Sequence, residues 1–520
     1  MELCGAQLTL ESTQLGLLDV GLGPFTPLRS LELCLRSERE HRGRDAARAA
    51  AEQPDQLEFE YVFPGARVLQ HVHVARDRAA AWMELEVVCQ STLELELHFA
   101  VASENDALDG QPQPRLERDD STGAAALRHR SLGWALLVGS PEAEPFELRS
   151  ASEGERIAVL RLPCSPARAA SGPLVVLLAG ALGGVEPLAQ ARDTQRWISR
   201  HWSSERTASA SDWLTFLAGP MQLNSSSAEL QQRMLWAKVE ARRAALRTAQ
   251  LAEGARACAH ASVLQPELLA QCQRAARRAL ELCLHAPEAS ELASADASSA
   301  GGLLGRLQRA QAELCAVQQE ACAPAASAAD GVLVLQPHFT RGADATRLEG
   351  VHVGATRFDL EVRRERTSAG RSTLTLALEN WSGPPLKVVL RPLLPPLSRA
   401  ALDDGRPVEL RDLAGGLVAH VLGRAVQGPA EWRLSAECGP ELTPRDGGLT
   451  VEQLECGAQH VTWRLSVPAG NDLRLPWRSD RAVRFEGDAS SHGAELHLHV
   501  PPRPGRDGLS TLTLRALALD

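Results

Sequence analysis

A carboxylate next to an aromatic side chain is the combination in this chain that best fits catalysis on a sugar. Glu240 lies four residues after Trp236, so both side chains share one face of a helix that contains them. Hydrolysis of a glycosidic bond needs two carboxylates, one as acid and one as base or nucleophile. Glu240 is therefore a candidate catalytic residue and Trp236 a candidate substrate-binding residue. The structural alternative is an exposed Glu240 that pairs with Arg243.

Other tryptophans could also stack on sugar rings if they are exposed. Trp202 is a second candidate substrate-binding residue, and Trp432 and Trp477 could act in the same way. Aromatic residues make up only 4% of the chain, so each tryptophan could instead fill an aromatic-poor core.

Two histidine pairs alternate along expected strands, at His71 and His73 and at His497 and His499. Each pair places two imidazoles on one strand face, which is half of a possible metal site. The alternative is two solvent-facing histidines, and no metal or cofactor is predicted. Cys315 and Cys322, one heptad apart, are read as core thiols. The sequence contains no Walker loop, G-x-S-x-G, H-E-x-x-H or G-x-G-x-x-G motif.

The candidate histidines and tryptophans near both ends of the chain are expected to lie on β-strands, because apolar and polar side chains alternate there with a period of two residues. Residues 57–63, 68–74, 82–88 and 93–99 alternate apolar and polar side chains, as half-buried strands do. The same alternation returns at 358–362, 374–378, 461–465 and 495–500, and a last strand is expected at 511–516. Residues 38–54 and 104–123 are expected to be loops, and 403–405 a turn.

Helical spacing replaces this alternation near Asp193. Ser226 and Glu229 form an S-x-x-E capping box at the start of one helix. Further helices are expected at 266–285 and 303–322. The chain is therefore predicted to be a β-rich multidomain (α+β) protein. Its expected parts are an N-terminal antiparallel β-sandwich (1–195), a helical linker with a shortened helical domain of three or four helices (196–328), a C-terminal β-sandwich (329–425), and a terminal strand region packing with that sandwich (426–520).

Composition restricts the partners and the compartment. The 520 residues carry a net charge of −10, which argues against nucleic acid as a partner. The longest apolar run, at 174–182, is too short to span a membrane and is read as a buried strand. The eleven cysteines form no C-x-x-C pair, and the N-terminus has no signal-peptide pattern. A cytoplasmic protein with reduced thiols is expected.

Three stretches resemble bacterial glycoside hydrolases of the six-hairpin, or (α/α)6-toroid, superfamily. They are residues 82–99, residues 196–243 with the segment ELQQRMLWAKVEARRA, and residues 330–360 beginning DGVLVLQP. In amylo-α-1,6-glucosidase-like and α-L-rhamnosidase-like members, a β-sandwich precedes a helical toroid and a second sandwich follows it. The resemblance implies this layout and a carbohydrate ligand.

The middle of the chain departs from that pattern. A toroid of twelve helices needs at least about 170–200 residues, whereas 105 positions lie from Ser226 to Asp330. The family's catalytic acid and base lie in the toroid, and no positions here match them. The first hypothesis is a glycoside-hydrolase-related protein with a truncated catalytic domain that still associates with carbohydrate. The second is an assembly protein whose amphipathic helices bind copies of the chain or a protein partner. A third is an active hydrolase with a rebuilt site near Glu240.

Overall fold

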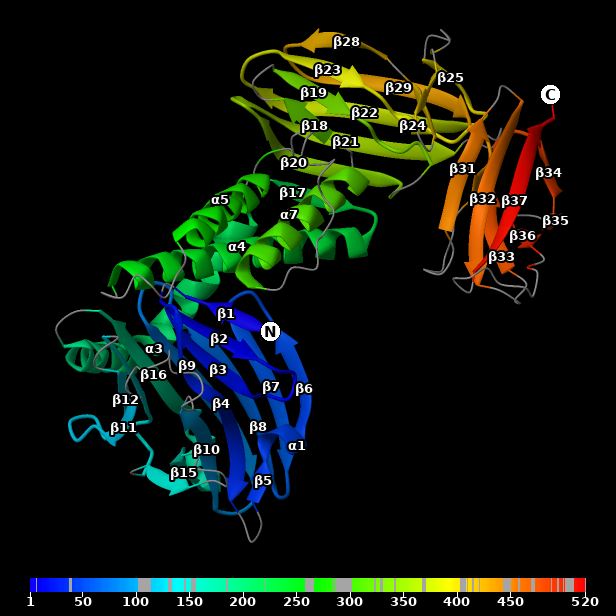
Figure 1. The fold of residues 1–520 in the computed structure, drawn as a ribbon. Coiled ribbons are helices and arrows are strands. Elements are labelled where there is room, and N and C mark those ends of the chain that lie inside the picture. The colour runs from blue at the N-terminus through cyan, green and yellow to red at the C-terminus, as the bar shows by residue number, and fades with distance from the viewer. Residues whose placement is uncertain are drawn as a thin grey trace. The chain divides into compact units, whose positions relative to one another are not determined.

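The computed structural model contains two compact units, whose elements are labelled in Figure 1. One unit comprises Met1–Ala218, Lys238–Leu280 and Ser298–Ala310, and the other Gly219–Ala237, Glu281–Ala297 and Gln311–Asp520. Strands account for 52% of the structure and helices for 26%. This composition confirms the predicted β-rich multidomain class. The structure describes residues 1–5, 7–36, 40–101, 114–129, 133–144, 146–150, 156–183, 186–219, 221–257, 266–283, 285, 302–321, 324–327, 331–340, 343–366, 371–402, 408, 410–413, 416–419, 421–442, 450–456, 459–468, 473–487, 489–492, 495–498, 500 and 509–519.

Two antiparallel sheets form a sandwich in the first unit. The first sheet has the order β1 (Glu2–Cys4), β2 (Leu8–Ser12), β3 (Leu18–Leu22), β4 (Phe25–Arg36), β10 (Leu93–Val101), β15 (Arg156–Cys164) and β14 (Glu147–Ser150), with β5 (Glu40–Arg42) paired to β4. The second has the order β11 (Arg115–Arg118), β12 (Ala125–His129), β13 (Trp134–Gly139), β16 (Leu174–Leu182), β9 (Ala80–Cys89), β8 (Ala66–Val74), β7 (Gln56–Phe63) and β6 (Ala47–Glu52).

The core between these two sheets consists of side chains from every second residue along the strands, as β7 shows. In β7 the buried side chains are Leu57, Phe59, Tyr61 and Phe63, and the residues between them are less buried. This pattern matches the period of the pleat, which sends successive side chains to opposite faces. The four strands predicted between residues 57 and 99 and the buried strand at 174–182 are confirmed.

Helix α3 (Pro187–Leu217) covers the outer face of the second sheet, where it packs on β16, β13 and β9 (Figure 1). Ile198 of this helix joins an apolar cluster with Trp82 and Leu177. The helical change predicted near Asp193 is therefore confirmed. Two short helices, α1 (Gly43–Ala46) and α2 (Pro166–Ala170), also belong to this unit.

Two of the predicted loops contain regular structure. Residues 40–52 form β5, α1 and β6, although their charged sequence lacks the alternation of a half-buried strand. The residues of β6 are mostly exposed and pair along the edge with β7, so pairing rather than burial holds this strand. Within the other loop, residues 115–118 form β11, whereas 102–113 lie outside the described residues.

Three helices occupy the described part of residues 226–330. They are α4 (Ala228–Ala257), α5 (Pro266–Leu282) and α7 (Gly302–Ala321), close to the predicted ranges. The start of α4 corrects the predicted capping box. The backbone N–H of Leu230 donates to Oγ of Ser227 at 3.3 Å, whereas Ser226 Oγ accepts from the N–H of Ala345 at 3.4 Å. Ser227 is therefore the N-cap, one residue later than predicted.

Strands dominate the second unit. Its largest sheet has the order β17 (Gln222–Ser225), β20 (Ala345–Val353), β21 (Thr356–Arg366), β22 (Ser372–Ser382), β29 (Ala430–Glu437) and β25 (Arg399–Leu402). Two further sheets contain β18 (Pro324–Ser327), β19 (Val332–Leu335), β23 (Leu386–Leu390) and β28 (Val421–Val426), and β24 (Leu393–Leu394), β27 (Gly416–Ala419) and β26 (Leu410–Leu413). The turn predicted at 403–405 lies outside the described residues.

The C-terminal strands form two more sheets with a core of their own. One contains β30 (Glu441–Leu442), β33 (Leu473–Arg478), β36 (Glu495–Leu498) and β35 (Ala489–His492), and the other β31 (Thr450–Cys456), β32 (His460–Pro468), β37 (Leu509–Ala518) and β34 (Val483–Gly487). Trp463, Leu475 and Leu496 are buried in this core. Among the described residues, no helix combines the length and apolarity that a membrane crossing requires.

Candidate functional site

Glu240 lies on helix α4 and contacts Arg243, as the structural alternative requires. Its Oε1 is 3.5 Å from Nη1 of Arg243, and the Glu240 side chain is 47% exposed. Burial of part of the residue raises the pKa of Glu240; the Arg243 charge opposes this, and the charges of Glu2 and Glu52 reinforce it. The catalytic role of Glu240 stays a prediction, and its ion pair gives it a structural one.

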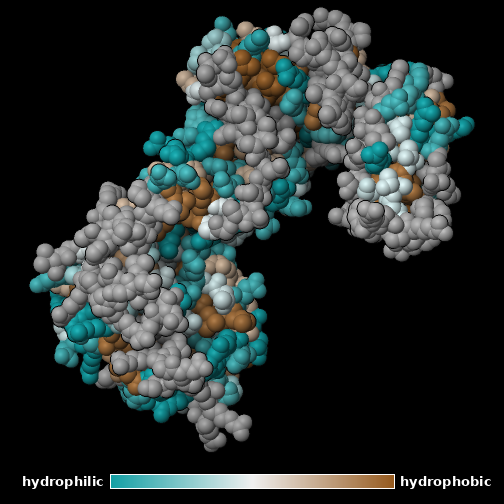
Figure 2. Space-filling view, in the orientation of Figure 1, coloured by the Kyte–Doolittle hydropathy of each residue, from teal (hydrophilic) through white to brown (hydrophobic). Residues whose placement is uncertain are grey.

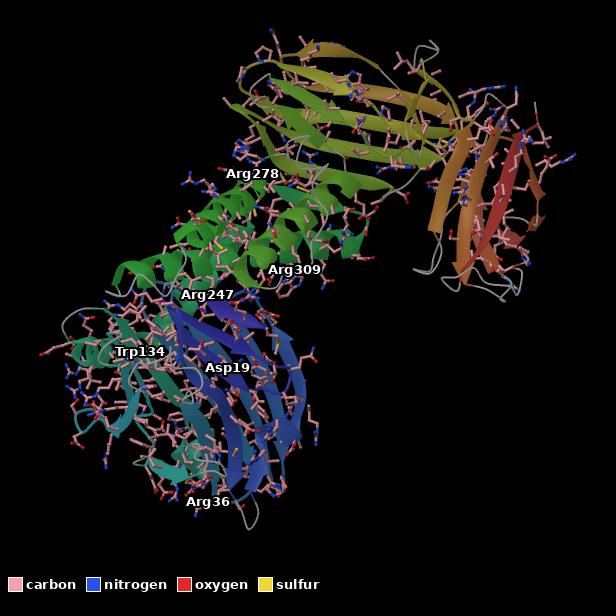
Figure 3. The ribbon with its side chains drawn as sticks, in the orientation of Figure 1. Asp19, Arg36, Trp134, Arg247, Arg278 and Arg309 are labelled. Atoms are coloured by element: carbon pink, nitrogen blue, oxygen red, sulfur yellow. The ribbon has the colours of Figure 1, made fainter. Side chains whose placement is uncertain are left out.

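Arg243 connects helix α4 by hydrogen bonds to the edge of the sandwich, at the end of strand β6. The Arg243 side chain is 1% exposed, and its guanidinium donates to the Glu52 carboxylate and to the backbone oxygen of Gln53 at 2.8 Å. One turn later Arg247, labelled in Figure 3, donates to Thr9 Oγ1 of β2 at 2.9 Å. These arginines serve the packing of α4 on the sandwich.

The candidate tryptophans are partly buried. Trp202 packs against the apolar cluster beneath α3, and Trp477 makes an edge-on contact with Phe485, with ring centroids 4.7 Å apart. Trp236 on α4 and Trp432 on β29 are half-buried. All four therefore contribute to packing, and their stacking on a sugar stays a prediction.

Of the N-terminal histidine pair, His73 lies in a buried environment. His73 is buried and stacks on Trp82, with ring centroids 5.1 Å apart. Burial lowers the pKa of His73 to about 3, so the imidazole is neutral. His499 lies outside the described residues. Within the described ranges, no group of three His, Cys, Asp or Glu side chains is placed to hold a metal ion.

A pocket of about 140 Å³ lies in the second unit, where strand ends of its large sheet meet the C-terminal strands. Three arginines, three carboxylates and three hydroxyl groups line it, together with smaller or apolar residues. The set is Phe339, Thr340, Asp344, Arg364, Glu365, Arg366, Ser372, Cys438, Gly439, Arg478, Ser479 and Asp480.

The register of β21 explains why two of these arginines share one side of the sheet. Phe358, Leu360 and Val362 are buried, and continuing that alternation gives Arg364 and Arg366. The apolar core ends at Val362, so the last two side chains on this face can be charged. Polar residues of neighbouring strand ends then complete the lining.

Protein contacts fix the guanidinium groups of the pocket. Arg364 donates through Nε to the backbone oxygen of His338 at 2.8 Å and through Nη1 to that of Ala343 at 2.7 Å. Arg478 contacts the Glu441 carboxylate at 3.0 Å, and Thr340 donates its hydroxyl hydrogen to the same carboxylate. Because these contacts hold the side chains in place, less conformational entropy would be lost on binding a ligand.

Asp480 contacts three other residues of the pocket lining. Its Oδ1 lies 2.8 Å from Nη2 of Arg366, and its Oδ2 accepts from Ser372 Oγ at 2.8 Å and from the backbone N–H of Cys438 at 3.1 Å. Burial, reinforced by the Asp480 charge, raises the pKa of the Cys438 thiol to about 12. This thiol is therefore protonated at neutral pH.

Sequence reasoning did not find this pocket. Its residues come from segments scattered over 339–480, and each segment reads as an ordinary charged strand end. The one available signal is the run Arg363-Arg364-Glu365-Arg366, which follows an alternating apolar strand.

The assembly hypothesis requires a continuous apolar helix face. Figure 2 shows hydrophilic residues over much of the described part of the visible surface, with hydrophobic residues in separate patches. Leu214, Leu235 and Leu268 are exposed apolar residues on three different helices. Single exposed leucines are ordinary on globular proteins, so an assembly role stays a prediction.

Comparison with known proteins gives partial structural likenesses. No protein-family model and no curated protein matches the chain. The chain is similar to a bacterial glucoamylase complexed with acarbose, with a TM-score of 0.35 and 7% identity over 46% of this chain and 40% of the glucoamylase. It is also similar to a GH92-family glycosyl hydrolase, with a TM-score of 0.30 and 13% identity over 46% of this chain and 38% of that enzyme. The match covers less than half of either enzyme, and a likeness of this extent assigns no activity to this chain.

Proposed function

We propose that this chain is a glycoside-hydrolase-related protein that binds a neutral carbohydrate in the pocket of its second unit and does not hydrolyse it. The observation that carries the proposal is the balanced, polar lining of that pocket. Arg364, Arg366 and Arg478 face an equal number of carboxylates, from Asp344, Glu365 and Asp480.

A neutral polyhydroxyl ligand suits this lining for a chemical reason. Each sugar hydroxyl both donates and accepts a hydrogen bond, so it can satisfy a carboxylate and a guanidinium together. An anionic ligand would add charge to a site whose charges already balance.

The absence of hydrolysis is proposed from the contacts of the Asp480 carboxylate, one of three that line the pocket. Both oxygens of Asp480 already have protein contacts, from Arg366 on one side and from Ser372 and Cys438 on the other. Glycosidic cleavage needs one carboxyl group that protonates the leaving oxygen and another that acts on the opposite side of the bond. An Asp480 carboxylate held in this way serves as a fixed acceptor for ligand hydroxyls.

The test is ligand-observed NMR with a panel of neutral mono- and disaccharides, together with a uronic acid and inorganic phosphate. We expect a neutral sugar to bind the wild-type protein and to bind Arg478→Gln at least about tenfold more weakly, from loss of a charged hydrogen bond. Asp344→Asn serves as a second pocket variant in case Arg478→Gln destabilises the fold. Arg484→Gln is the matched control, because Arg484 pairs with Glu486 at 3.0 Å outside the pocket and is 66% exposed.

Circular dichroism on every variant separates loss of binding from loss of folding. A hydrolysis assay on the bound sugars completes the test. Release of product would refute the non-hydrolytic part of the proposal. Binding of only the uronic acid or phosphate, or equal weakening in Arg484→Gln, would refute the assignment of a neutral ligand to this pocket.

A further inference from the structure

Two cysteines from opposite sheets of the first unit meet at one end of its sandwich. Cys89 is the last residue of β9 in the second sheet, and Cys164 is the last residue of β15 in the first. The chain leaves Cys89 and enters β10 at Leu93, which lies directly opposite Cys164 in the antiparallel register. Helix α2, which begins two residues after Cys164, packs on β9. Both connections bring the two residues together.

The environment of the two thiols differs. Cys164 is buried in the sandwich core, whereas Cys89 is half-buried and packs on the edge of the same core. Burial, reinforced by the neighbouring Cys89 thiol, raises the pKa of Cys164 to about 11, and Sγ of Cys164 donates to the backbone oxygen of Ser165 at 3.8 Å. Both are reduced in the structure. Cys89 is therefore the thiol that a reagent from solvent reaches first.

We propose that Cys89 and Cys164 form a redox-modification site, in which Cys89 reacts with a low-molecular-weight disulfide and Cys164 then resolves the product into an intramolecular disulfide. The site rests on geometry, namely the Leu93–Cys164 register pair and the packing of α2 on β9, and on the difference in exposure of the two thiols. It is independent of the carbohydrate pocket, which lies in the other unit.

The chemistry is two successive thiol–disulfide exchanges. The Cys89 thiolate, after losing its proton to solvent, attacks one sulfur of oxidised glutathione; a bond forms to Sγ of Cys89, and one glutathione thiolate leaves. Cys164 then loses its proton and attacks Sγ of Cys89, so the protein disulfide forms and the second glutathione thiolate leaves. Each departing thiolate takes up a proton. The two cysteines are oxidised together, and one glutathione disulfide is reduced to two thiols.

The cross-link would join the two sheets at the end of the sandwich where β9 and β15 end. It would close a long chain segment, from the end of β9 to the end of β15. Closing a long loop restricts the unfolded chain more than the folded one, so oxidation should stabilise this sandwich. A rise in melting temperature of about 5–10 °C is expected for a domain of this size.

The experiment treats reduced full-length protein with oxidised glutathione under native conditions and stops exchange with acid. The remaining thiols are then alkylated in denaturant near neutral pH, where the reactive thiolate is present. Intact mass and non-reducing peptide mapping identify the products. The expected product of the wild-type protein is a Cys89–Cys164 cross-linked peptide, with the higher melting temperature. Cys164→Ser should instead accumulate glutathione on Cys89, because the resolving thiol is gone. Cys89→Ser should leave Cys164 unmodified.

Cys34→Ser is the control, because Cys34 is a buried thiol of β4 in the same sandwich. It should give the same cross-link as the wild-type protein. Three results would overturn the proposal: no reaction at Cys89, a glutathione adduct on Cys89 that persists in the wild-type protein, or a disulfide that includes a cysteine other than this pair. The variants Cys89→Ser and Cys164→Ser are judged separately, so the failure of one to fold leaves the other decisive.

Discussion

Nη1 of Arg243 lies 3.5 Å from Oε1 of Glu240, and the two residues differ greatly in exposure. The Arg243 side chain is 1% exposed, whereas that of Glu240 is 47% exposed. The arginine also donates to the Glu52 carboxylate and to the backbone oxygen of Gln53. Arg243 therefore stabilises the packing of helix α4, and Glu240 is a peripheral member of its contacts.

Substitution of these two residues should accordingly have unequal effects. Arg243→Met should lower the free energy of unfolding by about 3 kcal/mol, because it removes the buried guanidinium that donates to the Glu52 carboxylate and to the backbone oxygen of Gln53. Glu240→Gln should change it by less than about 1 kcal/mol, as expected for an exposed ion pair. Urea denaturation followed by circular dichroism measures both. Equal losses would show that Glu240 has a larger structural role than its exposure indicates.

Acid should destabilise the first unit through Asp119. Burial alone would raise the pKa of Asp119, but hydrogen bonds from Arg192, Thr122 and Ser121 outweigh it and lower the pKa to about 2. A carboxyl group whose pKa is lower in the folded state stabilises the protein above its unfolded pKa. That contribution, about 2 kcal/mol, is lost as the pH falls from about 4 to about 2.

The variant Asp119→Asn tests this dependence. It should lose the stabilisation at neutral pH, and its unfolding free energy should change less than that of the wild-type protein between pH 4 and pH 2, the range set by these pKa values. Denaturation curves over a pH series give the comparison. Parallel pH profiles for the two proteins would contradict the assignment to Asp119.

Two adjacent serines at the start of α4 provide a matched pair. Ser227 caps the helix through the N–H of Leu230 at 3.3 Å, whereas Ser226 accepts from Ala345 in an exposed contact. Ser227→Ala should cost about 1 kcal/mol of unfolding free energy, and Ser226→Ala should cost less. Chemical denaturation distinguishes the two variants. A larger loss in Ser226→Ala would restore the capping box that the sequence predicts.

Glycine is required at one position of the pocket wall. A Cβ on residue 439 would lie 1.8 Å from the backbone oxygen of Pro396, so Gly439→Ala must displace backbone. We expect a loss of stability of about 2 kcal/mol or more, and loss of sugar binding with it. Gly428→Ala is the control, because a Cβ there has no described atom within 4 Å. Thermal unfolding and the NMR binding assay report the two effects, and similar behaviour of both variants would refute the steric argument.

Strands and helices can be predicted from the amino-acid sequence wherever burial of one face imposes a period on it. Residues 57–63 alternate because one strand face lies in the core, and the α5 segment repeats apolar residues every three or four positions because a helix buries one stripe. The edge strand β6 escaped prediction because pairing stabilises it while its side chains remain mostly exposed, so no periodic pattern is needed.

The contacts between polar residues of distant segments follow from the tertiary packing. Arg364 lies near Arg478 and Asp480 because the end of β21 meets the end of β33, and nothing in the local sequence of either segment specifies that encounter. The same holds for Cys89 and Cys164, whose contact depends on how two sheets pack. The period of apolar residues in a sequence reflects which face of a strand or helix is buried, and that is a local property of the element. A site depends on distances between elements, and those are fixed by the packing of the whole unit.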